Sequence, residues 1–123
     1  MRINSLIKKG KGWRIGWQEK AVTYKGLIGG DDWAFELTAI EMQDFCRLLL
    51  QIHQAIIDIN EHLMEEETIT CEVESDLMWL GAQGYPNNYS LSIILHHHRG
   101  CEGTWKENVT KDLIQATQSL MLF

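Results

Sequence analysis

Residues 38–63 read TAIEMQDFCRLLLQIHQAIIDINEHL, and they carry the strongest periodic signal in the chain. Thr38 and Glu41 have the spacing of a capping box, in which a hydroxyl and a carboxylate accept hydrogen bonds from backbone N–H groups at a helix start. The pattern that follows predicts one long helix with an apolar surface wide enough to pack on a sheet. One stripe recurs at intervals of three and four residues, and a second lies beside it: Met42, Phe45, Leu49, Ile52, Ile56, Ile59 and Leu63, then Cys46, Leu50, His53 and Ile57.

Alternating apolar residues predict strands on both sides of this helix. Before it, residues 13–17, 21–28 and 33–37 have the composition or alternation of strands, and after it residues 69–74, 77–83 and 89–95 do. A second capping-box spacing, at Thr104 and Glu107, opens a shorter helical pattern that runs to Leu120. The sequence therefore predicts an α+β fold in which three to four strands and a helix occur twice, as antiparallel sheets packed with two helices. We expect a single domain over residues 1–123, with pseudo-repeats at 1–65 and 66–123.

Composition is that of an ordinary globular protein, with 45% hydrophobic and 23% charged residues. The longest apolar runs fall far short of the roughly 20 residues that a membrane span needs. The first residues contain no apolar segment typical of a secretory signal. Cys46, Cys71 and Cys101 are odd in number and have no CxxC spacing, which favours reduced thiols. We expect a cytoplasmic protein that does not associate with a membrane.

The charge distribution gives the first functional hypothesis. Net charge is −6, yet residues 1–25 contain seven Lys and Arg against one Glu. Single-stranded nucleic acid is bound by such a combination of cations, which contact phosphates, and aromatic rings, which stack on bases. Trp13 and Trp17 share one face of a strand with Ile15, so they are either core residues or exposed stacking residues. The candidate nucleic-acid-binding residues are Lys8, Lys9, Lys11, Arg14, Trp17, Tyr24 and Lys25.

A metal site is the second hypothesis, and it rests on the run His96-His97-His98. On a strand, His96 and His98 point to the same face and form a pair that can ligate a metal. A zinc site needs further ligands, for which Cys71 and Cys101 are the candidates. The alternative to a metal site is that these histidines are simply the polar end of a strand.

Sequence motifs favour a noncatalytic protein without a cofactor. No glycine pattern matches a dinucleotide fingerprint or a Walker A loop. The serines lack a GxSxG setting, and Cys46 lies within the apolar helix, where a reactive thiolate is poorly supported. We therefore predict neither catalytic residues nor a bound cofactor.

Three motifs carry a resemblance over the whole chain: GWR at residues 12–14, WAFEL at residues 33–37 and RGCEGTW at residues 99–105. With these motifs the chain resembles a small family of uncharacterised cyanobacterial proteins, a domain of unknown function. The resemblance implies a fold similar to Whirly proteins and other single-strand-binding transcriptional regulators, which repeat four strands and a helix. KGK at residues 9–11 and FELT at residues 35–38 resemble Whirly segments near the nucleic-acid surface and at the strand-to-helix junction. The resemblance thus implies binding of single-stranded nucleic acid.

Three functional hypotheses therefore stand. The first is a noncatalytic binding module for single-stranded nucleic acid. The second is a protein-interaction subunit or homo-oligomer that uses the long helix or a sheet face, in which case the stripe of Ile57 should be exposed in the monomer. The third is a metal-dependent activity at His96 and His98.

Overall fold

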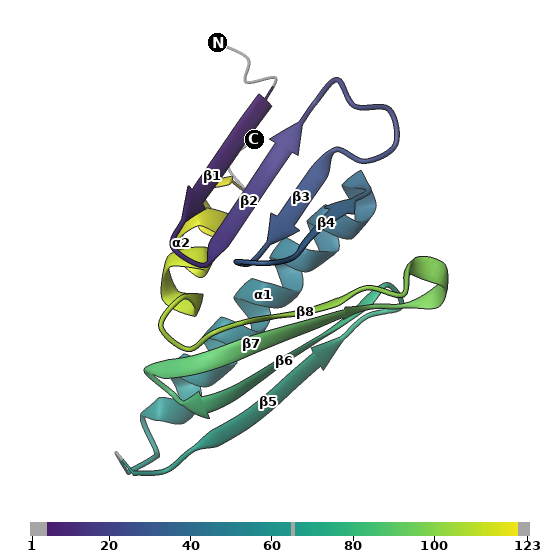
Figure 1. The fold of residues 1–123 in the computed structure, drawn as a ribbon. Coiled ribbons are helices and arrows are strands. Elements are labelled where there is room, and N and C mark those ends of the chain that lie inside the picture. Colours follow the sequence, from purple (N-terminus) through teal and green to yellow (C-terminus); the bar gives the residue numbers. More distant parts are fainter. Residues whose placement is uncertain (1–4, 65, 121–123) are drawn as a thin grey trace.

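The computed structural model describes residues 5–64 and 66–120, which form two four-stranded antiparallel sheets and two α-helices (Figure 1). Sheet A consists of β1 (Ser5–Gly10), β2 (Trp13–Gln18), β3 (Gly26–Gly29) and β4 (Ala34–Leu37), and it is followed by α1 (Ala39–Asn60). Sheet B consists of β5 (Ile69–Glu74), β6 (Met78–Tyr85), β7 (Asn88–Leu95) and β8 (Glu102–Trp105), and it is followed by α2 (Thr110–Leu120). Each sheet keeps its strands in chain order. The predicted α+β class with two antiparallel sheets is confirmed.

The predicted start of the long helix is confirmed in atomic detail. The hydroxyl of Thr38 accepts from the backbone N–H of Glu41 at 3.2 Å, and the Glu41 carboxylate accepts from the backbone N–H of Thr38 at 2.9 Å. The helix ends at Asn60, three residues before the end of its apolar stripe. Among the described residues, no helix is long and apolar enough to span a membrane.

Three details of the sequence-based prediction are wrong. Residues 21–25 form a loop instead of a strand, and Val22 is 96% exposed there, because β-forming residues stabilise a strand only when they pack on a neighbour. Strands β1 and β8 were not predicted, because their sequences show too little alternation of apolar and polar residues. The second capping box does not form, since Thr104 lies within β8 and α2 begins only at Thr110. The hydroxyl of Thr104 instead lies 3.0 Å from that of Ser92 on the neighbouring strand.

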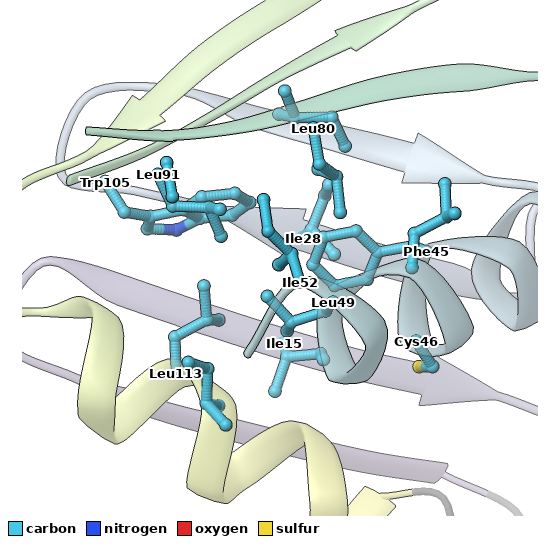
Figure 2. Close-up of a cluster of buried hydrophobic side chains, with 14 of the residues drawn as sticks. Ile15, Ile28, Phe45, Cys46, Leu49, Ile52, Leu80, Leu91, Trp105 and Leu113 are labelled. Atoms are coloured by element: carbon cyan, nitrogen blue, oxygen red, sulfur yellow. The ribbon is translucent and has the colours of Figure 1, made fainter. Parts of the chain in front are cut away.

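Each of the two helices contacts both sheets, and together they contribute to one shared core. Helix α1 contacts β3 and β4 of sheet A and β5 and β6 of sheet B, while α2 packs on β2, β7 and α1. Figure 2 shows the result: side chains from both sheets and both helices meet in one cluster. Its labelled members are Ile15, Ile28, Phe45, Cys46, Leu49, Ile52, Leu80, Leu91, Trp105 and Leu113.

The sheets are joined directly where the turn between β3 and β4 meets β8. The Trp105 indole N–H donates to the carbonyl of Gly29 at 2.8 Å, and the Trp33 indole N–H donates to the carbonyl of Thr104 at 3.2 Å. The centres of the two indole rings are 4.8 Å apart. Gly103 makes room for this contact, because a Cβ at that position would lie 2.6 Å from the Trp33 ring. The aromatic contact therefore fixes sheet A against sheet B.

Two buried groups that lose a proton at alkaline pH, the Cys46 thiol and the Tyr89 hydroxyl, predict how the stability of the fold depends on pH. Burial raises the pKa of the Cys46 thiol from 9.0 to about 11 and that of the Tyr89 hydroxyl from 10.0 to about 12, with nearby Cys71 adding to the latter. For both groups the pKa in the folded state lies above that in the unfolded state. Their contribution to the free energy of unfolding is therefore fully present below about pH 9 and is lost as pH rises toward 12. We expect the free energy of unfolding, measured by urea titration, to fall over this range.

Variants separate the two contributions. Cys46→Ala should remove the part of the decrease between pH 9 and 11, and Tyr89→Phe the part between pH 10 and 12. A decrease of wild-type size in both variants would contradict the assignment.

Candidate functional site

The register of sheet A separates the basic N-terminal residues onto two faces. Cross-strand partners in an antiparallel sheet point to the same side. The row Lys8, Ile15, Ile28 and Phe35 belongs to the side that faces the helices, because Ile15 and Ile28 are core residues. The rows on either side of it point the other way. We call this opposite side the outer face of sheet A; it carries Ile7, Lys9, Arg14, Gly16, Leu27, Gly29, Ala34 and Glu36.

Lys9 and Arg14 are direct cross-strand partners on this outer face. The Arg14 side chain lies over Gly29 of the next strand, since a Cβ at Gly29 would come within 2.9 Å of Arg14 Nε. That Nε is buried and has no hydrogen-bond partner within residues 5–64 and 66–120. The structure therefore places two cations side by side on a sheet surface, with one guanidinium held close to the backbone.

A groove of about 490 Å³ lies on the same face; Ile7, Gly16 and Leu27 of the row next to Lys9 and Arg14 line it, whereas the two cations themselves do not. Gly16 forms its floor: a Cβ there would lie 3.2 Å from Ile7 Cγ1 and 3.6 Å from Leu27 Cβ. Ile7 is 62% exposed, although it is a large apolar residue. The rim includes Tyr24, Lys25 and Glu36. Because Ile7 and Leu27 lie this close to the Gly16 position, the slot between them is shallow and offers apolar contact at the sheet surface.

Lys8, Trp13 and Trp17 lie on the other side of the sheet. The Lys8 ammonium donates to the hydroxyl of Ser119 on α2 at 2.5 Å. Trp13 and Trp17 are half-buried and pack against the core, and the Trp17 indole N–H donates to Glu19 at 2.8 Å. The register therefore puts the side chains of Lys8 and Trp17 on the side opposite Lys9 and Arg14, although Trp17 also lines the groove.

The remaining predicted basic and aromatic residues lie in the turns. Lys11 is exposed in the turn between β1 and β2. Tyr24 is exposed in the loop before β3, but the Arg99 guanidinium carbon lies 5.0 Å from the centre of its ring, and Arg99 Nη1 donates to its hydroxyl at 3.3 Å. The Lys25 ammonium donates to the backbone carbonyl of Glu19. Tyr24 and Lys25 thus border the groove while holding local contacts.

The histidine run does not have the strand geometry on which the metal hypothesis rests. Strand β7 ends at Leu95, and residues His97–Arg99 form a short 3-10 helix. His97 adopts a φ of 61°, which turns the chain away from the strand. His96 Nε2 lies 2.7 Å from a Glu74 carboxylate oxygen. Among the described residues, no group of three or more His, Cys, Asp or Glu side chains is arranged to hold a metal ion.

The second stripe of α1 is exposed only toward the end of the helix. Ile57 is 44% exposed, whereas Leu50 and His53 are half-buried and Cys46 is buried. His53 Nδ1 lies 3.2 Å from the Tyr89 hydroxyl, at a cavity of about 290 Å³, and burial lowers the pKa of its imidazole. Near the end of α1 the exposed large apolar side chains are therefore Ile57 and Ile59, and Ile59 belongs to the stripe that was expected to face the core.

The apolar part of the candidate site was not predicted from the sequence. Ile7 lies on β1, which has too little alternation to be identified, and Leu27 lies on a strand whose register was unknown. The usable signal was the pair Ile7 and Lys9, which share one face of any strand that contains both.

Comparisons with known proteins identify relatives but no activity. A model of a domain of unknown function, DUF1818, matches residues 8–120. The fold is similar to the crystal structure of a protein with unknown function from the DUF155 family of Prochlorococcus sp. NATL2A. That protein is 30% identical, with a TM-score of 0.89 over 94% of this chain and 97% of the other. None of the curated proteins matches the chain.

Proposed function

Because this chain belongs to the DUF1818 family of domains of unknown function, its family supplies no activity, and we propose from its surface that it is a noncatalytic module that binds single-stranded nucleic acid. The expected relationship to uncharacterised proteins with a cyanobacterial member is confirmed. Likeness to Whirly proteins, action in the cytoplasm and the nucleic-acid ligand all belong to the proposal. The order of four strands and a helix, present twice, supports the Whirly comparison.

The observation that carries the proposal is the outer face of sheet A. Lys9 and Arg14 supply adjacent positive charge for phosphates, and the slot between Ile7 and Leu27 offers apolar contact for bases. Gly16 carries no side chain, so Ile7 and Leu27 present their apolar atoms close together, while the Arg14 side chain covers Gly29 in the neighbouring row. Arg14 is held over the sheet, which reduces the side-chain entropy lost on binding. Binding by this face depends on charge and shape, and it tolerates many sequences.

Charge reversal on the outer face tests the proposal. We expect the double variant Lys9→Glu, Arg14→Glu to bind a fluorescent single-stranded oligonucleotide at least about tenfold more weakly at about 50 mM salt, since both cations would contact phosphates. The slope of log affinity against log salt should fall by about 1.4, because each phosphate contact contributes about 0.7 for a single strand. Fluorescence anisotropy of untagged protein measures both quantities.

Lys106→Glu with Lys111→Glu is the matched control. Both residues are exposed and lie after β8 and on α2, so the control changes net charge equally but leaves the outer face of sheet A intact. We expect it to weaken binding by less than about twofold, because neither side chain belongs to the outer face of sheet A and their remaining long-range effect is screened by salt. Equal losses in the two double variants, or no binding by the wild type at low salt, would rule out this site.

A further inference from the structure

Sheet B has an outer face of the opposite charge. The row Glu74, Trp79, Ile94 and Glu102 crosses all four strands on the side away from the core, and Glu72 and Thr104 lie in the next row. None of these strands contains Lys or Arg. The exposed acidic residues are Glu72, Glu74 and Glu102. His96 contacts the carboxylate of Glu74. The outer face of sheet B is therefore acidic around an apolar centre.

Trp79 forms that apolar centre together with Ile94. The Trp79 indole lies across Gly81, because a Cβ at Gly81 would come within 2.3 Å of its ring. The ring is thus spread over the sheet surface and is half-buried, on the side opposite the core to which both helices contribute. Ile94, its cross-strand partner, is exposed. Aromatic side chains laid flat at the centre of a surface, with charges at its margin, are typical of interaction sites.

We propose that the outer face of sheet B binds the outer face of sheet A of a second copy of this chain. Glu72 and Glu102 would pair with Lys9 and Arg14, while Trp79 would pack on the slot between Ile7 and Leu27. The two faces of one chain cannot meet, because each points away from the core that the sheets share. The contact therefore joins copies head to tail, which gives a ring if the rotation closes and a chain if it does not.

The expected contact is weak. Four strands spaced about 4.8 Å apart and about six residues long give a face of roughly 400 Å², which is at the small end for transient interfaces. Self-association also covers the face proposed for nucleic acid, so an oligonucleotide should compete with the second copy. This competition rests on the proposed function, whereas the self-association does not depend on it.

Sedimentation velocity at protein concentrations from about 10 μM to about 1 mM tests the association at low and high salt. We expect the average mass to rise with concentration at about 50 mM salt and much less at about 500 mM, because screening weakens the charge pairs. A protein that stays monomeric at the highest concentration and lowest salt overturns the proposal.

Charge-swap variants test the location. Lys9→Glu with Arg14→Glu, and separately Glu72→Lys with Glu102→Lys, should each stay monomeric, because each chain then presents like charges on both faces. An equimolar mixture of the two variants should associate again, which also shows that both are folded. Association that persists in either variant alone, or a mixture that stays monomeric, overturns the proposed pairing.

The same variants distinguish failure of this inference from failure of the proposed function. Glu72→Lys with Glu102→Lys should bind the single-stranded oligonucleotide at least as tightly as the wild type, since its sheet A is unchanged. Loss of self-association without loss of oligonucleotide binding is the expected result for this variant. Self-association by a wild type that binds no oligonucleotide would contradict only the proposed function.

Discussion

Replacing Trp105 with alanine is expected to lower the free energy of unfolding by about 4 kcal/mol, since large-to-small changes at buried aromatic residues cost about 3 to 5 kcal/mol. Trp105 is 1% exposed and packs against Trp33 and against Phe45 of α1, with ring centres 4.8 and 5.9 Å away. The substitution also leaves the Gly29 carbonyl of sheet A without its indole donor. Urea unfolding followed by circular dichroism measures the loss.

Trp105→Phe is the matched control for the hydrogen bond. Phenylalanine keeps much of the apolar volume but cannot donate to Gly29, so we expect a loss of about 1 to 2 kcal/mol, in the range of an unsatisfied buried acceptor and a small cavity. A loss below about 1 kcal/mol for Trp105→Ala would contradict the claim that this side chain joins the sheets, given the usual cost of such a cavity.

Arg99→Met is expected to lower the free energy of unfolding by about 2 to 3 kcal/mol, because removing one partner strands a buried charge. Arg99 Nε donates to the Glu41 carboxylate at 3.0 Å, and Nη2 donates to the backbone carbonyl of Glu36. Glu41 is 6% exposed, so its carboxylate would lose its cation without gaining water. The Arg99 side chain is 25% exposed, which makes the expected loss smaller than for a fully buried pair.

A double-mutant cycle with Glu41→Gln isolates this interaction. Glutamine at position 41 can still complete the capping box with Thr38 but carries no charge. In the Glu41→Gln background, Arg99→Met should therefore cost clearly less than in the wild type. Equal costs in both backgrounds would show that the ion pair contributes nothing and that the contacts of Arg99 with Tyr24 and the Glu36 carbonyl explain its role.

Sequence reasoning found the elements whose signals are local. The capping box at Thr38 and the apolar spacing of α1 depend on neighbouring residues alone, so the helix start was predicted correctly. Strand β8 is only four residues long, and its single large apolar residue, Trp105, owes its burial to sheet A and α1. The same long-range packing places the start of α2 at Thr110, after the capping box that the sequence suggested.

The candidate site was only partly predictable for a related reason. Charge counting identified Lys9 and Arg14, but which basic residues share a face depends on the pairing of β1 with β2. That pairing puts Lys8 and Trp17 on the helix side and brings Ile7 into line with Gly16 and Leu27. A surface that is assembled from three strands has no signature within any one of them.

Amide chemical-shift mapping is the most direct test of the proposed binding face. Uniformly ¹⁵N-labelled, untagged protein would be titrated with a single-stranded oligonucleotide at about 50 mM salt, where phosphate contacts are strong. We predict that the largest shifts fall on the outer face of sheet A, at Ile7, Lys9, Arg14 and Leu27, while the exposed residues Gln51 and Gln54 of α1 change little. Shifts confined to sheet B or to the helices, or no shifts at all, would contradict this prediction.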